Sequence, residues 1–170
     1  MRIRKMTLTA MLTGIALVIF IVEMQIPSLT HIPGIKLGLA NIVTLFAMSA
    51  LDRRSAAAVL FLRILTSAVI VGNISSLIYS AVGGICCFGV MSVVIGISQK
   101  KHLWAVSAIG AVFHNIGQLL TAYIVTGSAV VFMYLPVLTL SGITTGIFTG
   151  LCAYYVLKNK HINKMLRKFK

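Results

Sequence analysis

Acidic residues are nearly absent from this sequence. Among 170 residues there are two, Glu23 and Asp52, against 15 Lys and Arg, and the formal net charge is +13. Sites that work through clustered carboxylates cannot form from so few acids. The sequence also lacks a phosphate-binding loop of Walker type, a His-Glu-x-x-His motif and a nucleophile elbow. We therefore predict that the chain is not an enzyme.

Cysteine is scarce as well, with three residues in the whole chain. Cys86, Cys87 and Cys152 sit inside apolar runs and do not have the spacing of metal ligands. We interpret them as side chains that face lipid or the protein core. The sequence therefore predicts no metal site and no cofactor bound by this chain.

Polar residues in general are too few for a soluble protein of this size. Hydrophobic residues make up 59% of the sequence and charged residues 10%, and the mean hydropathy is +1.02. Such a chain cannot cover a soluble globule with polar groups. The basic residues form short groups between long apolar runs, without aromatic stacking platforms, which argues against nucleic-acid binding. We predict an integral membrane protein in contact with lipid.

The apolar runs predict a single transmembrane domain over residues 1–170, built as an all-α bundle of six transmembrane helices. The expected spans are about 6–26, 35–51, 55–71, 74–98, 103–125 and 131–157. The second is short for a hydrocarbon core of about 30 Å. A basic tail, 158–170, follows the last span.

The distribution of basic residues predicts the orientation of these spans. With the N-terminus in the cytoplasm, 13 of the 15 Lys and Arg fall on the cytoplasmic side, Lys36 falls outside, and Arg63 lies within a span. This is the positive-inside pattern. We expect a multi-pass protein of the cell membrane with both termini in the cytoplasm.

Seven polar residues at or near membrane depth form the candidate substrate-binding site. Ionisable groups there are costly and usually face a bundle interior or a cavity. His114 and Gln118 are four residues apart and share a helix face, with Asn115 beside them. The predicted set is Glu23, Lys36, Asn41, Arg63, His114, Asn115 and Gln118. The two cations favour an anionic or phosphate-bearing ligand.

Structural roles remain open for each of these residues. Lys36 can extend to the lipid headgroups or pair with Glu23. Arg63 can also pair with Glu23, as readily as it can bind a ligand. His114 and Gln118 can hold neighbouring helices together. The pocket hypothesis therefore rests on the whole set.

Small residues recur at four-residue spacing in two spans. Gly142, Gly146 and Gly150 form one ladder, and Ala10 with Gly14 forms a shorter one. Each allows another backbone to approach closely. Such ladders mostly serve internal packing, although one of them can face a partner subunit.

The run Gly34-Ile35-Lys36-Leu37-Gly38-Leu39-Ala40-Asn41, together with the His114-Asn115 pair, resembles the Gx transporter family, often labelled heptaprenyl diphosphate synthase component I. That family in turn resembles the substrate-binding S components of energy-coupling factor (ECF) transporters. The resemblance implies a six-helix protein of the bacterial plasma membrane that captures a vitamin or cofactor precursor from outside. A transmembrane coupling subunit and two ATPase subunits, which use ATP, would complete the importer.

The same resemblance suggests roles for two further segments. Ala10 and Gly14 match the small-xxx-small motif that meets the coupling subunit, with Gly in place of the usual second Ala, and the outer loop from Pro27 to Lys36 corresponds to the lid of the pocket. The alternative is a non-catalytic membrane subunit that assists heptaprenyl diphosphate synthase in isoprenoid-quinone biosynthesis. Prenyl transfer normally needs magnesium on clustered carboxylates. With Glu23 and Asp52 expected on opposite membrane faces, the chain cannot assemble that site alone.

Overall fold

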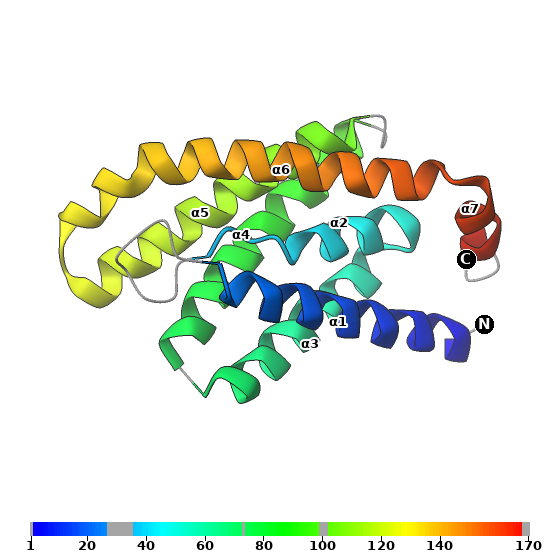
Figure 1. Cartoon of the computed structure of the whole chain (residues 1–170), viewed down its shortest axis with the longest axis horizontal. Helices are drawn as coiled ribbons and strands as arrows, with labels where there is room; N and C mark the ends of the chain where they lie inside the picture. Colours follow the sequence, from blue (N-terminus) through cyan, green and yellow to red (C-terminus); the bar gives the residue numbers. More distant parts are fainter. Residues whose placement is uncertain (1, 27–35, 73, 99–101, 168–170) are drawn as a thin grey trace.

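The computed structural model describes residues 2–26, 36–72, 74–98 and 102–167, and this part of the chain consists of helices and short connecting segments, without a strand. In chain order the elements are α1 (Arg2–Met24), α2 (Asn41–Ala50), α3 (Arg53–Val71), α4 (Ile74–Ser98), α5 (Leu103–Thr126), the 3-10 helix η1 (Ala129–Tyr134), α6 (Leu135–Lys158) and α7 (Lys160–Arg167). Figure 1 shows α5 and α6 side by side, with α1 on the other side of the short α2.

Five of these segments are long and apolar enough to cross a membrane within the described residues. They are Ile3–Met24, Arg53–Val71, Ser76–Ser98, Leu103–Thr126 and Ala129–Lys158. Each overlaps one of the predicted spans. Their outward faces carry large apolar side chains, among them Val69 and Ile97, which are 84% and 77% exposed. Exposed apolar surface on this scale is compatible with a multi-pass membrane protein.

The predicted span at 35–51 does not form one helix. Its described part begins with the non-helical segment Lys36–Gly38, passes through a turn, and becomes α2 only at Asn41. Ten helical residues cover about 15 Å at 1.5 Å per residue, half of a hydrocarbon core of about 30 Å. The physical reason lies at Gly38, whose φ of +78° is outside the range of a right-handed helix. The predicted count of six transmembrane helices therefore becomes five long helices and one short one among the described residues.

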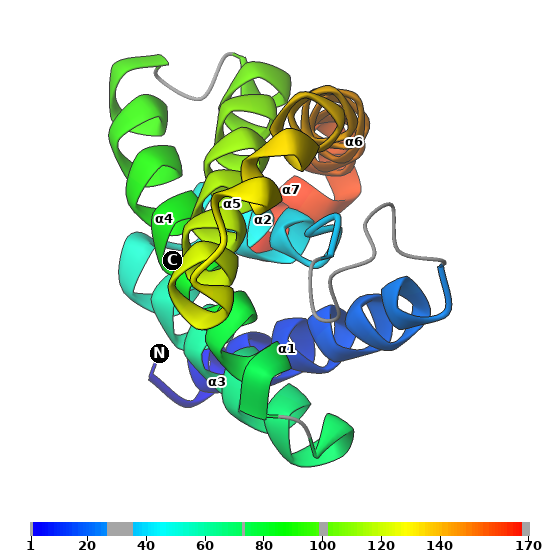
Figure 2. The same ribbon diagram turned by 90° about the vertical axis from the view of Figure 1, so that its left-hand side faces the viewer.

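The short helix α2 lies at the centre of the bundle. It packs against α1, α3, α4, α5 and α6, and Figure 2 shows it between α1 and α6. Val43, Leu45, Ala47 and Met48 from this helix are buried in the main hydrophobic core. Helix α2 is therefore enclosed by other helices of the bundle.

Close helix contacts in the other half of the bundle depend on glycine. A Cβ added to Gly146 would lie 2.5 Å from the Cα of Ala108, and one added to Gly150 would lie 2.5 Å from the Cα of Trp104. The ladder on α6 therefore packs against α5 and serves internal packing. Gly14 behaves differently, because a Cβ there would meet nothing within 4 Å.

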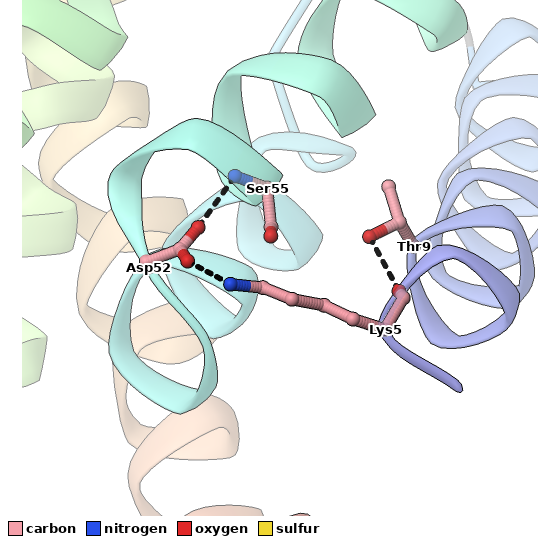
Figure 3. Close-up of polar contacts among 4 residues, drawn as sticks. All are labelled: Lys5, Thr9, Asp52 and Ser55. Carbon is pink, nitrogen blue, oxygen red and sulfur yellow. Dashed lines mark hydrogen bonds and ion pairs between the residues drawn. The ribbon is translucent and has the colours of Figure 1, made fainter. Parts of the chain in front are cut away.

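One ion pair within the described residues joins α1 to the start of α3. Lys5 Nζ contacts Asp52 Oδ2, and Asp52 Oδ1 accepts a hydrogen bond of 2.7 Å from the N–H of Ser55, so Asp52 is the N-cap of α3 (Figure 3). The hydrogen bond from Lys5 and those from Ser55 lower the pKa of Asp52 to about 2. This pair fixes one end of α1 against the α2–α3 connection.

The basic tail predicted at 158–170 contains a further helix. Lys160–Arg167 form α7, in which Leu166 is buried and Lys160 and Lys164 are exposed. The side chain of Asn159 supports its start, because Oδ1 accepts a hydrogen bond of 2.9 Å from the N–H of His161. Helix α7 and the start of α1 lie at the same end of the bundle (Figure 1).

Candidate functional site

Six of the seven predicted site residues are buried, and they come from four helices. Their exposed fractions are 5% for Glu23, 8% for Asn41, 4% for Arg63, 3% for His114, 2% for Asn115 and 0% for Gln118. Lys36 is half-buried. A buried polar group in an apolar bundle is costly unless it is bonded, so this concentration of polar side chains is the candidate site.

Glu23 holds the backbone that leads into α2. Its Oε1 accepts a hydrogen bond from the N–H of Gly38, and its carboxylate also faces the N–H groups of Leu39 and Ala40. These N–H groups lie at the start of a helix, where partners within the helix are missing and the helix dipole favours an anion. Glu23 is thereby engaged by backbone donors.

Lys36 contacts three other elements of the bundle. Its Nζ donates a 3.0 Å hydrogen bond to Ser76 Oγ on α4 and lies 3.8 Å from the ring centroid of Phe20 on α1. Its N–H donates a 3.3 Å hydrogen bond to Gln118 Oε1 on α5. Among the described residues the ion pair is the one between Lys5 and Asp52, so the pairing of Glu23 with Lys36 is not a direct contact.

His114 is enclosed by two glycines. A Cβ at Gly38 would lie 2.8 Å from His114 Cδ2, and one at Gly83 would lie 2.9 Å from its Cε1 and Nδ1. Asn41 is at the same place, since its Nδ2 would be 2.9 Å from a Cβ at Gly38. The absence of side chains at both glycines lets the imidazole fit between α4 and the segment before α2.

Arg63 enters the cluster from α3. A Cβ at Gly84 on α4 would lie 3.6 Å from its Nη2, and the guanidinium interacts electrostatically with Glu23, Lys36 and His114. Within the described part of the chain its Nε and Nη2 have no hydrogen-bond partner. The ion pair found among the described residues is that of Lys5 with Asp52, so the pairing of Arg63 with Glu23, one of the structural roles left open by the sequence, is not a direct contact.

Two further donor atoms of the cluster also have no hydrogen-bond partner in the described residues. Asn41 Nδ2 and Gln118 Nε2 are buried and have no partner there. Gln118 Oε1 accepts a hydrogen bond from the Lys36 N–H. This hydrogen bond determines the orientation of the Gln118 amide, in which Nε2 is left without a partner. His114 Nδ1 is a further buried nitrogen of the cluster without a partner in the described residues.

Asn115 does not join this cluster. Its Nδ2 donates a 2.6 Å hydrogen bond to the carbonyl oxygen of Leu138 on α6 and would lie 2.7 Å from a Cβ at Gly142. This geometry is that of a polar contact between α5 and α6. The structure thus groups Glu23, Lys36, Asn41, Arg63, His114 and Gln118, and places Asn115 at the neighbouring helix contact.

A small cavity of about 10 Å³ lies next to the cluster. Gly38 and Asn41 line it on one side, and Ser107, Thr145 and Thr149 line it on the other. Ser107 Oγ and Thr149 Oγ1 are 2.9 Å apart and hydrogen-bonded. This volume holds about one water molecule. Leu37, Gly38 and Leu39 of the segment before α2 also line this cavity.

Several residues of the site were not predicted from the sequence. Phe20 lies three residues before Glu23, so helical spacing alone would have placed both on one face of α1. Ser76, Gly83 and the hydroxyls of α6 carry no such signal, because serine, threonine and glycine are frequent throughout these spans. Whether these residues reach the site depends on how the helices are rotated about their axes.

The predicted docking residues Ala10 and Gly14 lie on an exposed face of α1. Residues 27–35 of the predicted lid lie outside the described residues. No group of three or more His, Cys, Asp or Glu side chains with metal-binding proximity occurs in the described ranges. The cysteines are free, and Cys87 is buried in the core.

The fold and this cluster define a multi-helix protein of membrane-spanning composition with a buried, donor-rich polar site. The chain belongs to the family described as heptaprenyl diphosphate synthase component I, which matches residues 12–156. That range includes every predicted site residue except Ala10. Searches of curated proteins and of solved structures found no match.

Proposed function

We propose that this chain is the substrate-binding subunit of an ECF-type importer, and that the buried cluster binds a small anionic vitamin or cofactor precursor. The observation that carries the proposal is that four amide and guanidinium donor atoms of the cluster are buried without a partner in the described residues: Asn41 Nδ2, Arg63 Nε and Nη2, and Gln118 Nε2. Leaving buried donors unpaired costs about 1–3 kcal/mol each, and more for a charged group. A ligand rich in acceptors would remove this cost.

The charges of the cluster favour an anion. Lys36 and Arg63 contribute two positive charges, while the carboxylate of Glu23 already accepts from backbone N–H groups. A guanidinium in an apolar bundle is stabilised by a bidentate contact with a carboxylate or phosphate. The ligand class is therefore a small molecule with a carboxylate or phosphate group, held by Arg63 and hydrogen-bonded by Asn41 and Gln118.

Binding of such a ligand requires movement of Lys36–Leu39. The cavity of about 10 Å³ accommodates little more than a water molecule. The segment is held by the contacts of Lys36 with Ser76 and Gln118 and of Gly38 with Glu23. Displacing this segment would open the four donors toward one end of the bundle. The positive-inside pattern assigns that end to the outside of the cell.

The exposed face of α1 supports the proposed partner. A Cβ at Gly14 would meet nothing within 4 Å, and Ala10 is exposed one turn before it. Small residues that are not used within the bundle leave a shallow surface on which another helix can pack closely. We assign this face to the coupling subunit, with ATP hydrolysis by the ATPase subunits. The end with α7 then lies in the cytoplasm of a bacterial cell.

The family description supports a second candidate function. A component I implies a partner that supplies the synthase activity, and this chain would be its non-catalytic membrane subunit. The two acidic side chains lie apart. The carboxylate of Glu23, on α1, accepts a hydrogen bond from Gly38 before the start of α2, whereas Asp52 is the N-cap of α3. They do not form a magnesium site together.

Co-purification separates the two candidates. We expect the tagged chain, solubilised in mild detergent from its native cells, to retain an ECF coupling subunit and ATPase subunits, and Gly14→Leu to reduce their recovery. Ile21→Phe, another exposed position on α1, is the matched control and should leave recovery unchanged. Recovery of a soluble prenyl synthase without ECF subunits would instead support the second candidate.

A further inference from the structure

An apolar groove lies on the surface of the bundle, and none of its lining residues belongs to the polar cluster. Its volume is about 290 Å³. Leu12, Ile15 and Ile19 of α1 form one wall, and Cys152, Ala153 and Val156 of α6 form the other. Ile42, Val43 and Phe46 of α2 form the floor. The groove exists because α1 and α6 both pack against α2 and α2 is too short to fill the space between them.

The groove is too small to enclose a helix. A helix is about 10 Å across, so 290 Å³ accommodates less than one turn. Every lining side chain is apolar, which leaves unsatisfied the backbone groups of any extended peptide placed there. A hydrocarbon chain is narrower and has no polar groups to satisfy. In a bundle surrounded by lipid, the tail of a membrane lipid fits these conditions.

One end of the groove is positively charged. Val156, a lining residue, lies in the last turn of α6, which ends at Lys158 and is followed directly by α7. Lys160 and Lys164 follow on α7 and, like Lys158, are exposed. The start of α1 lies at the same end of the bundle (Figure 1), and its first turn contains the exposed Arg4. Exposed basic residues next to an apolar surface attract anionic lipid headgroups.

We propose that this groove is a binding site for one tail of an anionic phospholipid, whose headgroup contacts Lys160 and Lys164 on α7. The shape and the lining select a hydrocarbon chain, and the charge at the mouth selects the headgroup. The site is separate from the buried polar cluster. It does not depend on the proposed import function.

Native mass spectrometry of the delipidated full-length chain tests this site. The probes are phosphatidylglycerol and phosphatidylcholine with identical acyl chains. We expect one phosphatidylglycerol per chain to bind more tightly than phosphatidylcholine. The double variant Lys160→Gln/Lys164→Gln should weaken that binding by at least roughly fivefold, the factor for about 1 kcal/mol of headgroup attraction. Arg54→Gln, an exposed basic residue at the start of α3, should leave it unchanged.

A second pair of variants tests the groove itself. Val156→Trp fills its rim, whereas Val137→Trp lies on α6 outside it, and both side chains are substantially exposed, at 42% and 50%. We expect only Val156→Trp to reduce phosphatidylglycerol binding. Equal binding of the two lipids, equal effects of the two tryptophans, or equal binding of free inorganic phosphate would overturn the proposal. So would a dimer that forms in place of the lipid complex.

Discussion

Replacing Gly38 by alanine tests the geometry on which the polar cluster depends. The substitution imposes two costs. A left-handed φ of +78° costs an L-residue about 1–2 kcal/mol. The new Cβ also lies 2.8 Å from His114 Cδ2 and 2.9 Å from Asn41 Nδ2. Since His114 is enclosed on its other side by Gly83, relieving this overlap adds about 1–3 kcal/mol.

Gly72→Ala provides the matched control for this prediction. Gly72 has a similar φ of +64°, but a Cβ there would meet nothing within 4 Å. It therefore imposes the backbone cost without the overlap, and the stiffening of the unfolded chain by alanine is common to both variants. At about 2–4 °C per kcal/mol for a chain of this length, we expect Gly38→Ala to melt roughly 2–12 °C below Gly72→Ala.

Thermal unfolding of both variants in the same detergent, followed by the fluorescence of Trp104, gives the difference directly. A second measurement asks whether the variant retains the ligand of the polar cluster, because Gly38→Ala also shifts His114 and Asn41. Equal melting temperatures for the two variants would show that Gly38 is not in close contact with His114, and would refute the site geometry.

Three further predictions address other parts of the structure. Arg63→Gln should abolish retention of an anionic ligand while Arg54→Gln leaves it intact, as measured by mass spectrometry of the released small molecule. Gly146→Ala should lower the melting temperature of the protein by several degrees more than Gly14→Ala, because its Cβ would meet α5 backbone at 2.5 Å while that of Gly14 meets nothing. The ion pair of Asp52 should make stability depend on pH: because its pKa is lowered to about 2 from 3.8, its stabilising contribution is present above pH 3.8 and is lost as the pH falls through 2. Between pH 5 and 2 the wild type should therefore lose stability relative to Asp52→Asn, which keeps an N-cap; parallel curves would contradict the ion pair.

Most of the helical framework could be predicted from the sequence because long apolar runs separated by charged residues leave few alternatives. The exception was 35–51, where apolar composition predicted a continuous helix. There the left-handed conformation of Gly38 and the carboxylate of Glu23 determine the backbone. That carboxylate comes from another helix, and a local pattern cannot reveal such a contact.

The candidate site was predictable as a set of residues and less so as a geometry. Helical spacing placed His114 and Gln118 on one face, and both lie in the cluster. Asn115 is adjacent in sequence, yet it faces α6 and bonds Leu138. Which neighbour each side chain meets depends on how the helices rotate about their axes, and one residue of rotation moves a side chain by about 100°.

The most direct test of the central claim is to identify what the buried cluster carries. Native mass spectrometry of the full-length chain, released from mild detergent and followed by identification of the ejected small molecule, makes that measurement. We predict one molecule per chain that bears a carboxylate or phosphate, present in the wild type and in Arg54→Gln and absent from Arg63→Gln. A neutral molecule, or an anion retained equally by Arg63→Gln, would contradict the assignment of this cluster as an anion-binding site.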